Sequence, residues 1–239
     1  MSRQLKSLIG SLYSMAVLPL NVIAYTFFKK KIISPVDQKK LWQSRKEIDW
    51  EQIYAVEKDP YYQFFDRFIL EKLKGLSVSN FLEIGCYYGY RLNKFSMNIP
   101  EKIFLGIDLG FDNLSMGQKK LMWGRSNIGL INGDACALPF KDKSIDAIYT
   151  VVCLTHIDYS HIGRAIDELV RVCSKELLLV EVDHRCMKFR KKLACLNWGY
   201  GYMHAYEKAV GDRMRTVSIT PLYDADHHPR YTVFHFSRP

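Results

Sequence analysis

The sequence predicts an α/β fold: a doubly wound, seven-stranded sheet, mostly parallel, with an antiparallel C-terminal hairpin and an N-terminal apolar helix ahead of it. The first observation is that short apolar runs alternate with segments of helical spacing between residues 61 and 182. This alternation is typical of parallel strands joined by right-handed crossovers. The second observation is a pair of strand-like segments at 216–222 and 231–236, separated by turn-forming residues, which predicts the hairpin at one sheet edge.

Each element is assigned from its own pattern. The first helix has apolar residues at helical spacing and is followed by Gly75, a residue that favours helix ends. Helices are expected at 61–74, 91–97, 113–123 and 162–172. Buried parallel strands are expected at 81–84, 103–107, 127–132, 146–153 and 177–182.

Residues 80–90, which read NFLEIGCYYGY, are the stretch around which the chain is organised. Here Gly85 and Gly89 follow a short apolar run, which suits a buried strand that turns tightly into a helix. Such a turn presents backbone N–H groups and a helix N-terminus to a ligand. Alone, it indicates a nucleotide-type site without naming the cofactor.

The chain has 239 residues and a formal charge of +9, so there is room for one α/β domain and an extension. The basic excess is concentrated at the ends: residues 1–49 hold nine Lys and Arg against three acids, and residues 184–239 hold ten against four. Basic ends either favour anionic partners or form an ordinary solvated surface. We expect an apolar N-terminal segment at 1–35, a linker or cap at 36–60, and the α/β domain at 61–239.

Residues 7–28 carry no charge and are followed directly by Lys29–Lys31. Their length is close to the roughly 20 residues that cross a bilayer as a helix, but Pro19, Asn21 and several serines weaken the apolar character. Three alternatives stay open: a membrane-spanning helix, an interfacial segment, and a helix packed on the protein. If the segment spans, the lysines keep the α/β domain on the cytoplasmic side, as a membrane-anchored domain.

The six cysteines are widely spaced and form no C-x-x-C pair. The sequence therefore predicts neither a disulfide framework nor a metal site, and reduced intracellular thiols are expected.

Polar residues follow three of the predicted strands, at the sheet edge where open α/β folds bind ligands. They are Asp108, Gly133-Asp134 and Leu154-Thr155-His156. Asp108 follows Gly89 at about the spacing at which an acid reaches a ribose hydroxyl. The joint pattern of glycine turn and strand-end acids predicts a nucleoside-containing cofactor.

Six motifs occur in order along the chain. They are Glu83-Ile84-Gly85-Cys86-x-x-Gly89, Gly106-Ile107-Asp108, Asn132-Gly133-Asp134-Ala135, Ser144-Ile145-Asp146-Ala147-Ile148, Leu154-Thr155-His156-Ile157 and Asp167-Glu168-Leu169-Val170-Arg171-Val172. Together they resemble the class I S-adenosylmethionine (SAM)-dependent methyltransferases, of the broad group that acts on small molecules and lipids. The resemblance covers residues 81–181 and the final hairpin but not residues 1–60. It implies a Rossmann-like fold with SAM as the cofactor.

The resemblance also implies residue roles. The implied cofactor-binding residues are Glu83, Gly85, Cys86, Tyr87, Gly89, Asp108, Leu109, Asp134 and Ala135. The first five would hold the methionine part, Asp108 the ribose hydroxyls, and Asp134 with Ala135 the adenine edge.

Two departures from the family pattern stand out. Tyr87 replaces the usual middle glycine, and its ring either lines the pocket or packs on the adjoining helix. Ser174-Lys175-Glu176 replaces the usual Pro-Gly-Gly turn before the last parallel strand, so a different turn is expected there.

His156, just past the fourth strand, is the leading candidate for a catalytic base or acceptor contact, because histidine titrates in the useful range. A structural role is the alternative. The weaker candidates are His161, His184, Tyr223, Asp226, His227 and His228. The basic, Trp-containing stretch at 184–198 either touches a membrane or an anionic substrate, or is an ordinary helix with a solvated basic face.

The expected activity is methyl transfer to an oxygen, or less favourably a nitrogen, of a small-molecule or lipid-like acceptor. Nucleic acid is disfavoured, because no Asn-Pro-Pro-aromatic stretch follows the fourth strand. The alternatives are an RNA or protein methyltransferase and a catalytically silent SAM-binding partner subunit. The sequence leaves the acceptor's identity and the oligomeric state open.

Overall fold

The computed structural model describes residues 60–121, 124–157, 159–182, 202–223 and 229–239, together with Gln43 and Lys58. The apolar segment 7–28, nearly all of the linker 36–60 and the basic stretch 184–198 lie outside these residues, so the predictions made for them stay predictions. Within the described ranges, none of the helices combines the length and apolar character that crossing a membrane requires.

The described chain alternates strands and helices. The strands are β1 (Asn80–Ile84), β2 (Ile103–Asp108), β3 (Ile128–Asn132), β4 (Ile145–Val151), β5 (Cys173–Val182), β6 (Arg215–Tyr223) and β7 (Pro229–Ser237). The helices are α4 (Pro60–Lys74), α5 (Tyr90–Asn98), α6 (Phe111–Leu121), α7 (Tyr159–Val172) and α9 (Tyr202–Val210), with the 3-10 turns η1 (Leu154–His156) and η3 (Gly211–Arg213).

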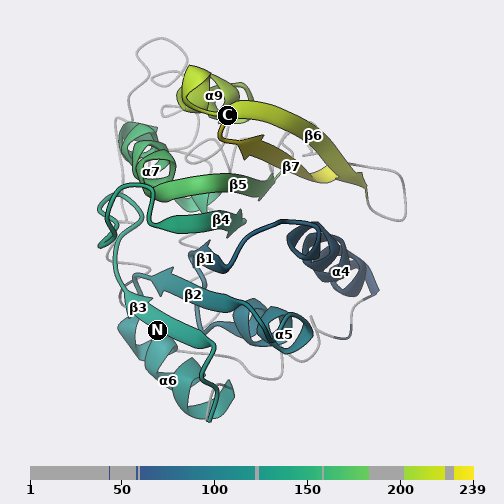
Figure 1. Cartoon of the computed structure of the whole chain (residues 1–239), viewed down its shortest axis with the longest axis vertical. Helices are drawn as coiled ribbons and strands as arrows, with labels where there is room; N and C mark the ends of the chain where they lie inside the picture. The colour runs from purple at the N-terminus through teal and green to yellow at the C-terminus, as the bar shows by residue number, and fades with distance from the viewer. Residues whose placement is uncertain are drawn as a thin grey trace, which may run out of the picture.

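The strands form one sheet in the order β3-β2-β1-β4-β5-β7-β6. The four pairings that join β3, β2, β1, β4 and β5 are parallel, whereas β7 is antiparallel to both β5 and β6. Figure 1 shows the twisted sheet running from β3 at the lower left to β6 at the upper right. The predicted fold class and its C-terminal hairpin are thereby confirmed for the described residues, and the N-terminal helix is not among them.

Two hydrophobic cores cover the two faces of the sheet. One contains Ile166 and Leu169 of α7 and Tyr206 of α9. The other contains Phe65 of α4 and Leu92 of α5, together with a leucine of α6. Because strand side chains alternate between faces, both faces of the central strands are apolar over most of their length.

Two ion pairs to a buried carboxylate join α4 to α5. The carboxylate of Asp66 on α4 is 4% exposed and accepts from Arg91 Nε at 2.9 Å and from Lys94 Nζ at 2.8 Å. The ring of Phe65 packs against Tyr231 at the start of β7, with 4.6 Å between ring centroids. Thus α4 bridges the first crossover helix and the C-terminal hairpin.

The structure corrects three details of the sequence-based assignment. Strand β4 ends at Val151 rather than at Cys153, because Val152 adopts a left-handed conformation with φ of 54°. The predicted turn at 174–176 is wrong: α7 ends at Val172 and β5 begins at Cys173. Helix α9 had no counterpart among the predicted elements; of its residues whose burial is described, Tyr206 and Val210 are buried.

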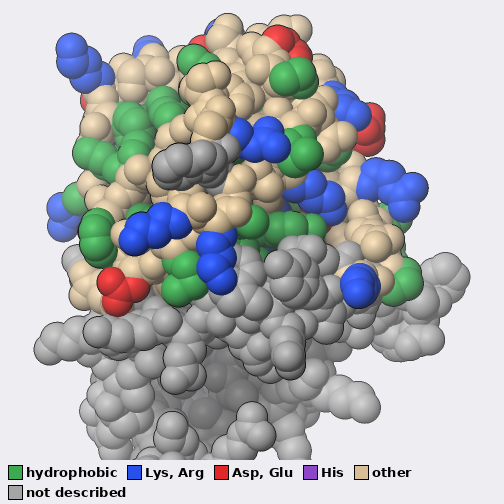
Figure 2. Space-filling view, turned by 90° about the horizontal axis from the view of Figure 1, so that it is seen from below, with side chains coloured by type: hydrophobic (Ala, Val, Ile, Leu, Met, Phe, Trp, Pro, Cys, Tyr) green, Lys and Arg blue, Asp and Glu red, His purple; other side chains and the backbone are tan. Residues whose placement is uncertain are grey.

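The surface seen from below in Figure 2 bears Lys and Arg side chains scattered among hydrophobic and uncharged ones. Lys119 and Lys120, in the last turn of α6, are exposed. On the described part of this face the basic side chains do not merge into one continuous patch.

Gly117 of α6 is expected to be essential for packing, because an added Cβ would overlap the carbonyl oxygen of Tyr88. Gly117→Ala should lower the free energy of unfolding by about 1–3 kcal/mol, as overpacked substitutions do. Gly163→Ala in α7 is the matched control, since a Cβ there meets nothing within 4 Å. That control should raise stability by about 0.5–1 kcal/mol, the helix preference of alanine. Denaturant unfolding measures both, and equal effects of the two substitutions would contradict the packing argument.

Candidate active site

The turn after β1 is held by the end of β2. The backbone N–H groups of Gly85 and Cys86 both donate to the carbonyl oxygen of Ile107, at 2.8 and 3.1 Å. The N–H of Gly89 donates to the carbonyl oxygen of Cys86 at 2.8 Å, and α5 begins at the next residue. Gly85 and Gly89 have φ of 73° and 80°, conformations in which glycine is favoured. The sequence-predicted turn is therefore present, and it is hydrogen-bonded to the neighbouring strand.

Tyr87 sits in this turn with φ of 55°, a left-handed conformation that costs a non-glycine residue roughly 1–2 kcal/mol. Its N–H donates to Oδ2 of Asp108 at 2.9 Å. Its half-buried ring lies edge-on to Tyr88, with 5.0 Å between centroids. The tyrosine thus takes up the backbone geometry that the family's usual glycine would adopt more easily.

Asp108 connects the turn to the start of α6. Oδ1 accepts from the N–H of Gly110 at 2.8 Å, and Oδ2 accepts from Tyr87. Burial raises the pKa of Asp108 above its usual value, although the backbone donors oppose that shift. On the far side, Asn132 Nδ2 donates to the carbonyl oxygens of Asp108 and Leu109, both at 3.0 Å. Each carboxylate oxygen retains acceptor capacity for a further donor.

Asp134 and Ala135 lie half-exposed just beyond β3. Asp134 Oδ1 accepts from the N–H of Cys136 at 2.9 Å, and its carbonyl oxygen accepts from Ala137 at 2.9 Å. These bonds close a small turn that presents residues 134–137 at the sheet edge.

Two α7 residues fix the loop that follows this turn. Glu168 Oε2 accepts from the N–H of Leu138 at 2.7 Å. Arg171 donates to the carbonyl oxygens of Phe140 and Leu138, at 2.9 and 3.1 Å, and also to Glu168. Hydrogen bonding to Arg171 lowers the pKa of the Glu168 carboxyl. The motif at 167–172 therefore serves to hold the loop after β3.

Glu83 is buried, at 3% exposure, beneath the β1 turn. Oε2 accepts from the hydroxyl of Tyr149 at 3.2 Å. Burial raises the pKa of Glu83 to about 7, and the nearby positive charge of Arg91 opposes the rise. The carboxyl is thus poised to bind or release a proton near neutral pH.

The strand ends place most of the predicted site residues at one edge. Ile84 is in register with Ile107 of β2 and with Thr150 of β4, and Asp108 is in register with Asn132 of β3. The turn after β1, Asp108, Asp134 and the residues after β4 are therefore neighbours along this edge. His156 is exposed at the end of η1, while Leu154 and Thr155 are buried.

The weaker candidates are spread out. His161 is exposed on α7, and Tyr223 is exposed at the end of β6. His184, Asp226, His227 and His228 lie outside the described residues. Among the described residues, Cys86, Cys136, Cys153 and Cys173 form no disulfide. In the described part of the chain, no three His, Cys, Asp or Glu side chains are grouped as metal ligands.

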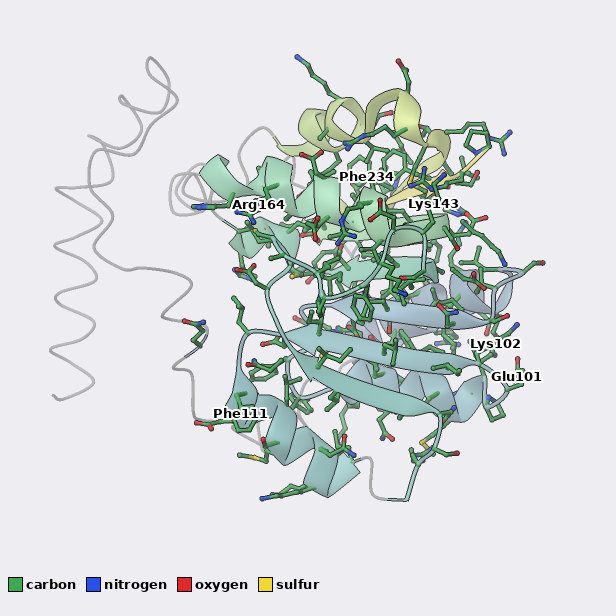
Figure 3. All side chains as sticks on the ribbon, turned by 60° about the vertical axis from the view of Figure 1, so that its left-hand side comes forward. Glu101, Lys102, Phe111, Lys143, Arg164 and Phe234 are labelled. Atoms are coloured by element: carbon green, nitrogen blue, oxygen red, sulfur yellow. The ribbon has the colours of Figure 1, made fainter. Side chains whose placement is uncertain are left out.

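Two residues at this edge were missed by the sequence analysis. Glu181 at the end of β5 is 2% exposed, and its signal was a lone acid in an apolar strand, the same signal as Glu83. Phe111 is 63% exposed at the start of α6, two residues before the predicted start of that helix. In Figure 3 it projects from one edge of the domain, and Glu101 and Lys102 lie at the other.

The polar groups at this edge of the sheet fit a nucleoside cofactor. Carboxylates at the ends of β2 and β3 suit hydroxyl and amino donors, and the glycine turn at the end of β1 brings backbone close to a ligand. Because Asp108 is bonded to the turn itself, the two parts of such a site have a fixed separation. The chemistry of the residues present therefore matches the cofactor that the sequence motifs predict.

Comparison with known proteins agrees with this geometry. Residues 81–176 match the family model described as a methyltransferase domain. The chain is 28% identical over 110 residues to the phthiotriol/phenolphthiotriol dimycocerosates methyltransferase 1 of Mycobacterium ulcerans, covering 46% of this chain and 39% of that protein. It is 32% identical over 96 residues to the demethylmenaquinone methyltransferase of Roseiflexus castenholzii, covering 40% and 39%. The chain thus spans about two fifths of the length of each curated relative.

Solved structures share the fold. The magnesium protoporphyrin IX methyltransferase of Synechocystis PCC 6803, solved with bound SAH, superimposes with a TM-score of 0.67. The superposition covers 85% of this chain and all of that one at 13% identity. A likeness at this level of identity establishes a common architecture.

Glu83 should make stability depend on pH. Its pKa is about 7 when folded and 4.5 in the unfolded reference, so the folded state binds more protons between these values. The free energy of unfolding should therefore fall as pH rises from about 4.5 to about 7, by up to about 3 kcal/mol for this group. Glu83→Gln should lose this contribution and keep the slope due to Glu181. Denaturant unfolding across that range measures it.

Glu71→Gln on the exposed surface of α4 is the control, because the Glu71 side chain is 61% exposed. It should leave the pH dependence unchanged. Parallel curves for wild type and Glu83→Gln would show that folding does not raise the pKa of Glu83.

Proposed function

Since residues 81–176 match the family model of a methyltransferase domain, we propose that this protein transfers a methyl group from SAM to an oxygen of a small-molecule or lipid-like acceptor. The observation that carries the proposal is the hydrogen bond from the turn after β1 to Asp108, within a segment that matches that family. The bond joins the two strand ends that a nucleoside cofactor would contact.

The residues at the strand ends would each bind a different part of the cofactor. The backbone of the Gly85–Gly89 turn would hold the methionine part, with Glu83 beneath it. Asp108, beside Leu109, would accept from the ribose hydroxyls, and Asp134 with the Ala135 N–H would bind the adenine edge. When bound, SAM supplies a methyl group on a sulfonium, which is open to in-line displacement.

The protein's part in such a transfer is to hold the acceptor atom in contact with the methyl group. A base is needed where the acceptor is a poorly ionised hydroxyl. His156 is the candidate for this role because it is exposed at the end of η1, the turn that follows β4. Strand β4 pairs with β1, which carries the glycine turn. His156 would take the hydroxyl proton as the oxygen–carbon bond forms.

The relatives support an acceptor that is apolar over much of its surface. One is named for phthiotriol dimycocerosates and the other for demethylmenaquinone. Such an acceptor would be consistent with membrane association through residues 7–28 and with a cytoplasmic domain held at the membrane; both remain proposals. The described part of the surface in Figure 2 has no continuous basic patch, so it lends no support to an RNA acceptor.

Cofactor binding is tested by removing the strand-end acids. Asp108→Ala and Asp134→Ala should each weaken SAM binding by about 10- to 100-fold, because hydrogen bonds to charged groups contribute about 1.5–3 kcal/mol. Titration calorimetry with SAM measures the affinity. Asp167→Ala, which removes a surface carboxylate 64% exposed on α7, should bind as the wild type does. Wild-type affinity in both test variants would refute the cofactor assignment.

The acceptor and the base can be found in one assay. Purified protein incubated with methyl-labelled SAM should label components of a lipid or small-molecule extract rather than RNA. His156→Ala should lower the rate about 100-fold or more, the usual contribution of general base catalysis. His235→Asn is the control, because His235 pairs with Glu176 on β5 at 2.8 Å, away from the site. Labelling confined to the RNA fraction, or an unaffected His156→Ala rate, would contradict the proposal.

A further inference from the structure

The carboxyl end of β5 holds a buried acid to which the proposed chemistry gives no role. Glu181 is 2% exposed, yet its carboxylate is fully engaged. Oε1 accepts from Thr150 Oγ1 at 2.8 Å and from the N–H groups of Cys153 and Leu154 at 3.3 and 3.1 Å. Oε2 accepts from the N–H of Thr155 at 3.1 Å. One side chain on β5 therefore binds three successive backbone amides that follow β4.

The short turn that contains these amides offers their N–H groups no hydrogen-bond acceptor of its own. The first N–H groups of a helical turn lack partners inside it, and η1 covers only Leu154–His156. A carboxylate at this position satisfies the donors and matches their partial positive charge. Loss of the carboxylate would leave the buried N–H groups of Leu154 and Thr155 without acceptors.

The chain before η1 is strained, which makes an external tie necessary. Val152 has φ of 54°, an unusual conformation for a β-branched residue. Such strain persists where surrounding interactions hold it, and it is concentrated at functional sites. Here the N–H of Val152 donates to the carbonyl oxygen of Val180 at 2.7 Å, and Glu181 holds the three residues that follow. Strand β5 thus fixes the whole bend after β4.

Burying the Glu181 carboxylate that makes these hydrogen bonds costs free energy. Burial raises the pKa of Glu181 to about 7, although Thr150 and the backbone donors oppose the rise. A neutral side chain of similar size would avoid this desolvation cost. A side chain whose role was only to fill space at this position would therefore not need to be an acid.

The bend lies between the two halves of the proposed site. On one side, Cys153 packs so closely on Gly85 that an added Cβ would overlap the Cys153 sulfur. On the other side, the bend ends at exposed His156, whose N–H donates to the carbonyl oxygen of Cys153 at 2.9 Å. Displacement of the bend would therefore shift His156 relative to the glycine turn.

We propose that Glu181 is a positioning residue for methyl transfer: it fixes residues 153–156 so that His156 and the acceptor are held at the correct distance from the cofactor turn. This inference rests on the proposed function. Glu181 acts through the backbone it binds and touches neither substrate nor cofactor. Thr150, which donates to the same carboxylate oxygen as Cys153 and Leu154, belongs to the same unit.

Glu181→Gln tests the proposal. The amide has a single acceptor oxygen, so its NH2 group would face at least one backbone N–H of the bend. The rate is measured with methyl-labelled SAM on the extract fraction that the wild type methylates. At saturating SAM it should fall about 10- to 100-fold, as misplacement by about 1 Å does, while KM for SAM changes less than threefold. Hydrogen exchange at residues 153–155 should be at least tenfold faster, irrespective of activity.

Glu176→Gln is the matched control, since Glu176 lies on the same strand but pairs with His235, and its rate should stay within twofold of the wild type. Thr150→Val, which removes one bond and keeps the acid, should lower the rate at least threefold with KM for SAM unchanged; it serves if Glu181→Gln does not fold. Three results, each obtained with an active wild type, would overturn the inference alone. They are unaltered rates in the folded test variants, unaltered hydrogen exchange at residues 153–155, and a loss of SAM affinity that accounts for the slower rate. A wild type that methylates no fraction would overturn the proposed function and the inference with it.

Discussion

The carbonyl oxygen of Ile107 accepts hydrogen bonds from both Gly85 and Cys86, and the next residue, Asp108, accepts one from Tyr87. The turn after β1 is therefore shaped by the end of β2 as much as by its own glycines. This constraint decides where the other parts of the candidate site lie. Asp108 binds the N–H of Gly110, the residue before helix α6, and Gly117 of that helix lies against the backbone of Tyr88. The geometry of the turn thus depends on contacts from two neighbouring elements.

Two buried glutamates flank β4, and their surroundings give them different roles. Glu83 has one side-chain hydrogen-bond donor, Tyr149, and the field of Arg91. Glu181 has three backbone donors and a threonine. Burial raises the pKa of each to about 7. Glu83 is suited to respond to a charge bound at the turn after β1. Glu181 instead binds the backbone N–H groups that follow β4. The two glutamates, at the ends of the strands on either side of β4, are therefore not interchangeable.

The sequence predicted the fold well because each buried strand carries a near-continuous apolar run and each crossover helix repeats its apolar residues at helical spacing. It also placed Asp108 and Asp134 at strand ends, since both follow such runs directly. It could not predict where β4 stops. The run Val151-Val152-Cys153 is uniformly apolar, and the bend is hydrogen-bonded to Glu181, 28 residues beyond Cys153. The role of Glu168 and Arg171 was likewise hidden, because helical periodicity reports burial and not the loop that a polar side chain holds.

The direct junction between α7 and β5, with Val172 ending the helix and Cys173 starting the strand, has a consequence for how the protein can vary. Glu168 and Arg171 at the end of the helix clamp the loop after β3, and Glu181 near the end of the strand clamps the bend after β4. No residue lies between the helix and the strand that carry these two sets of hydrogen bonds. An insertion or deletion at 172–173 would therefore disturb the adenine side and the acceptor side of the proposed site in a single step. We therefore expect that insertions and deletions are not tolerated at this junction, unlike those in an ordinary surface loop.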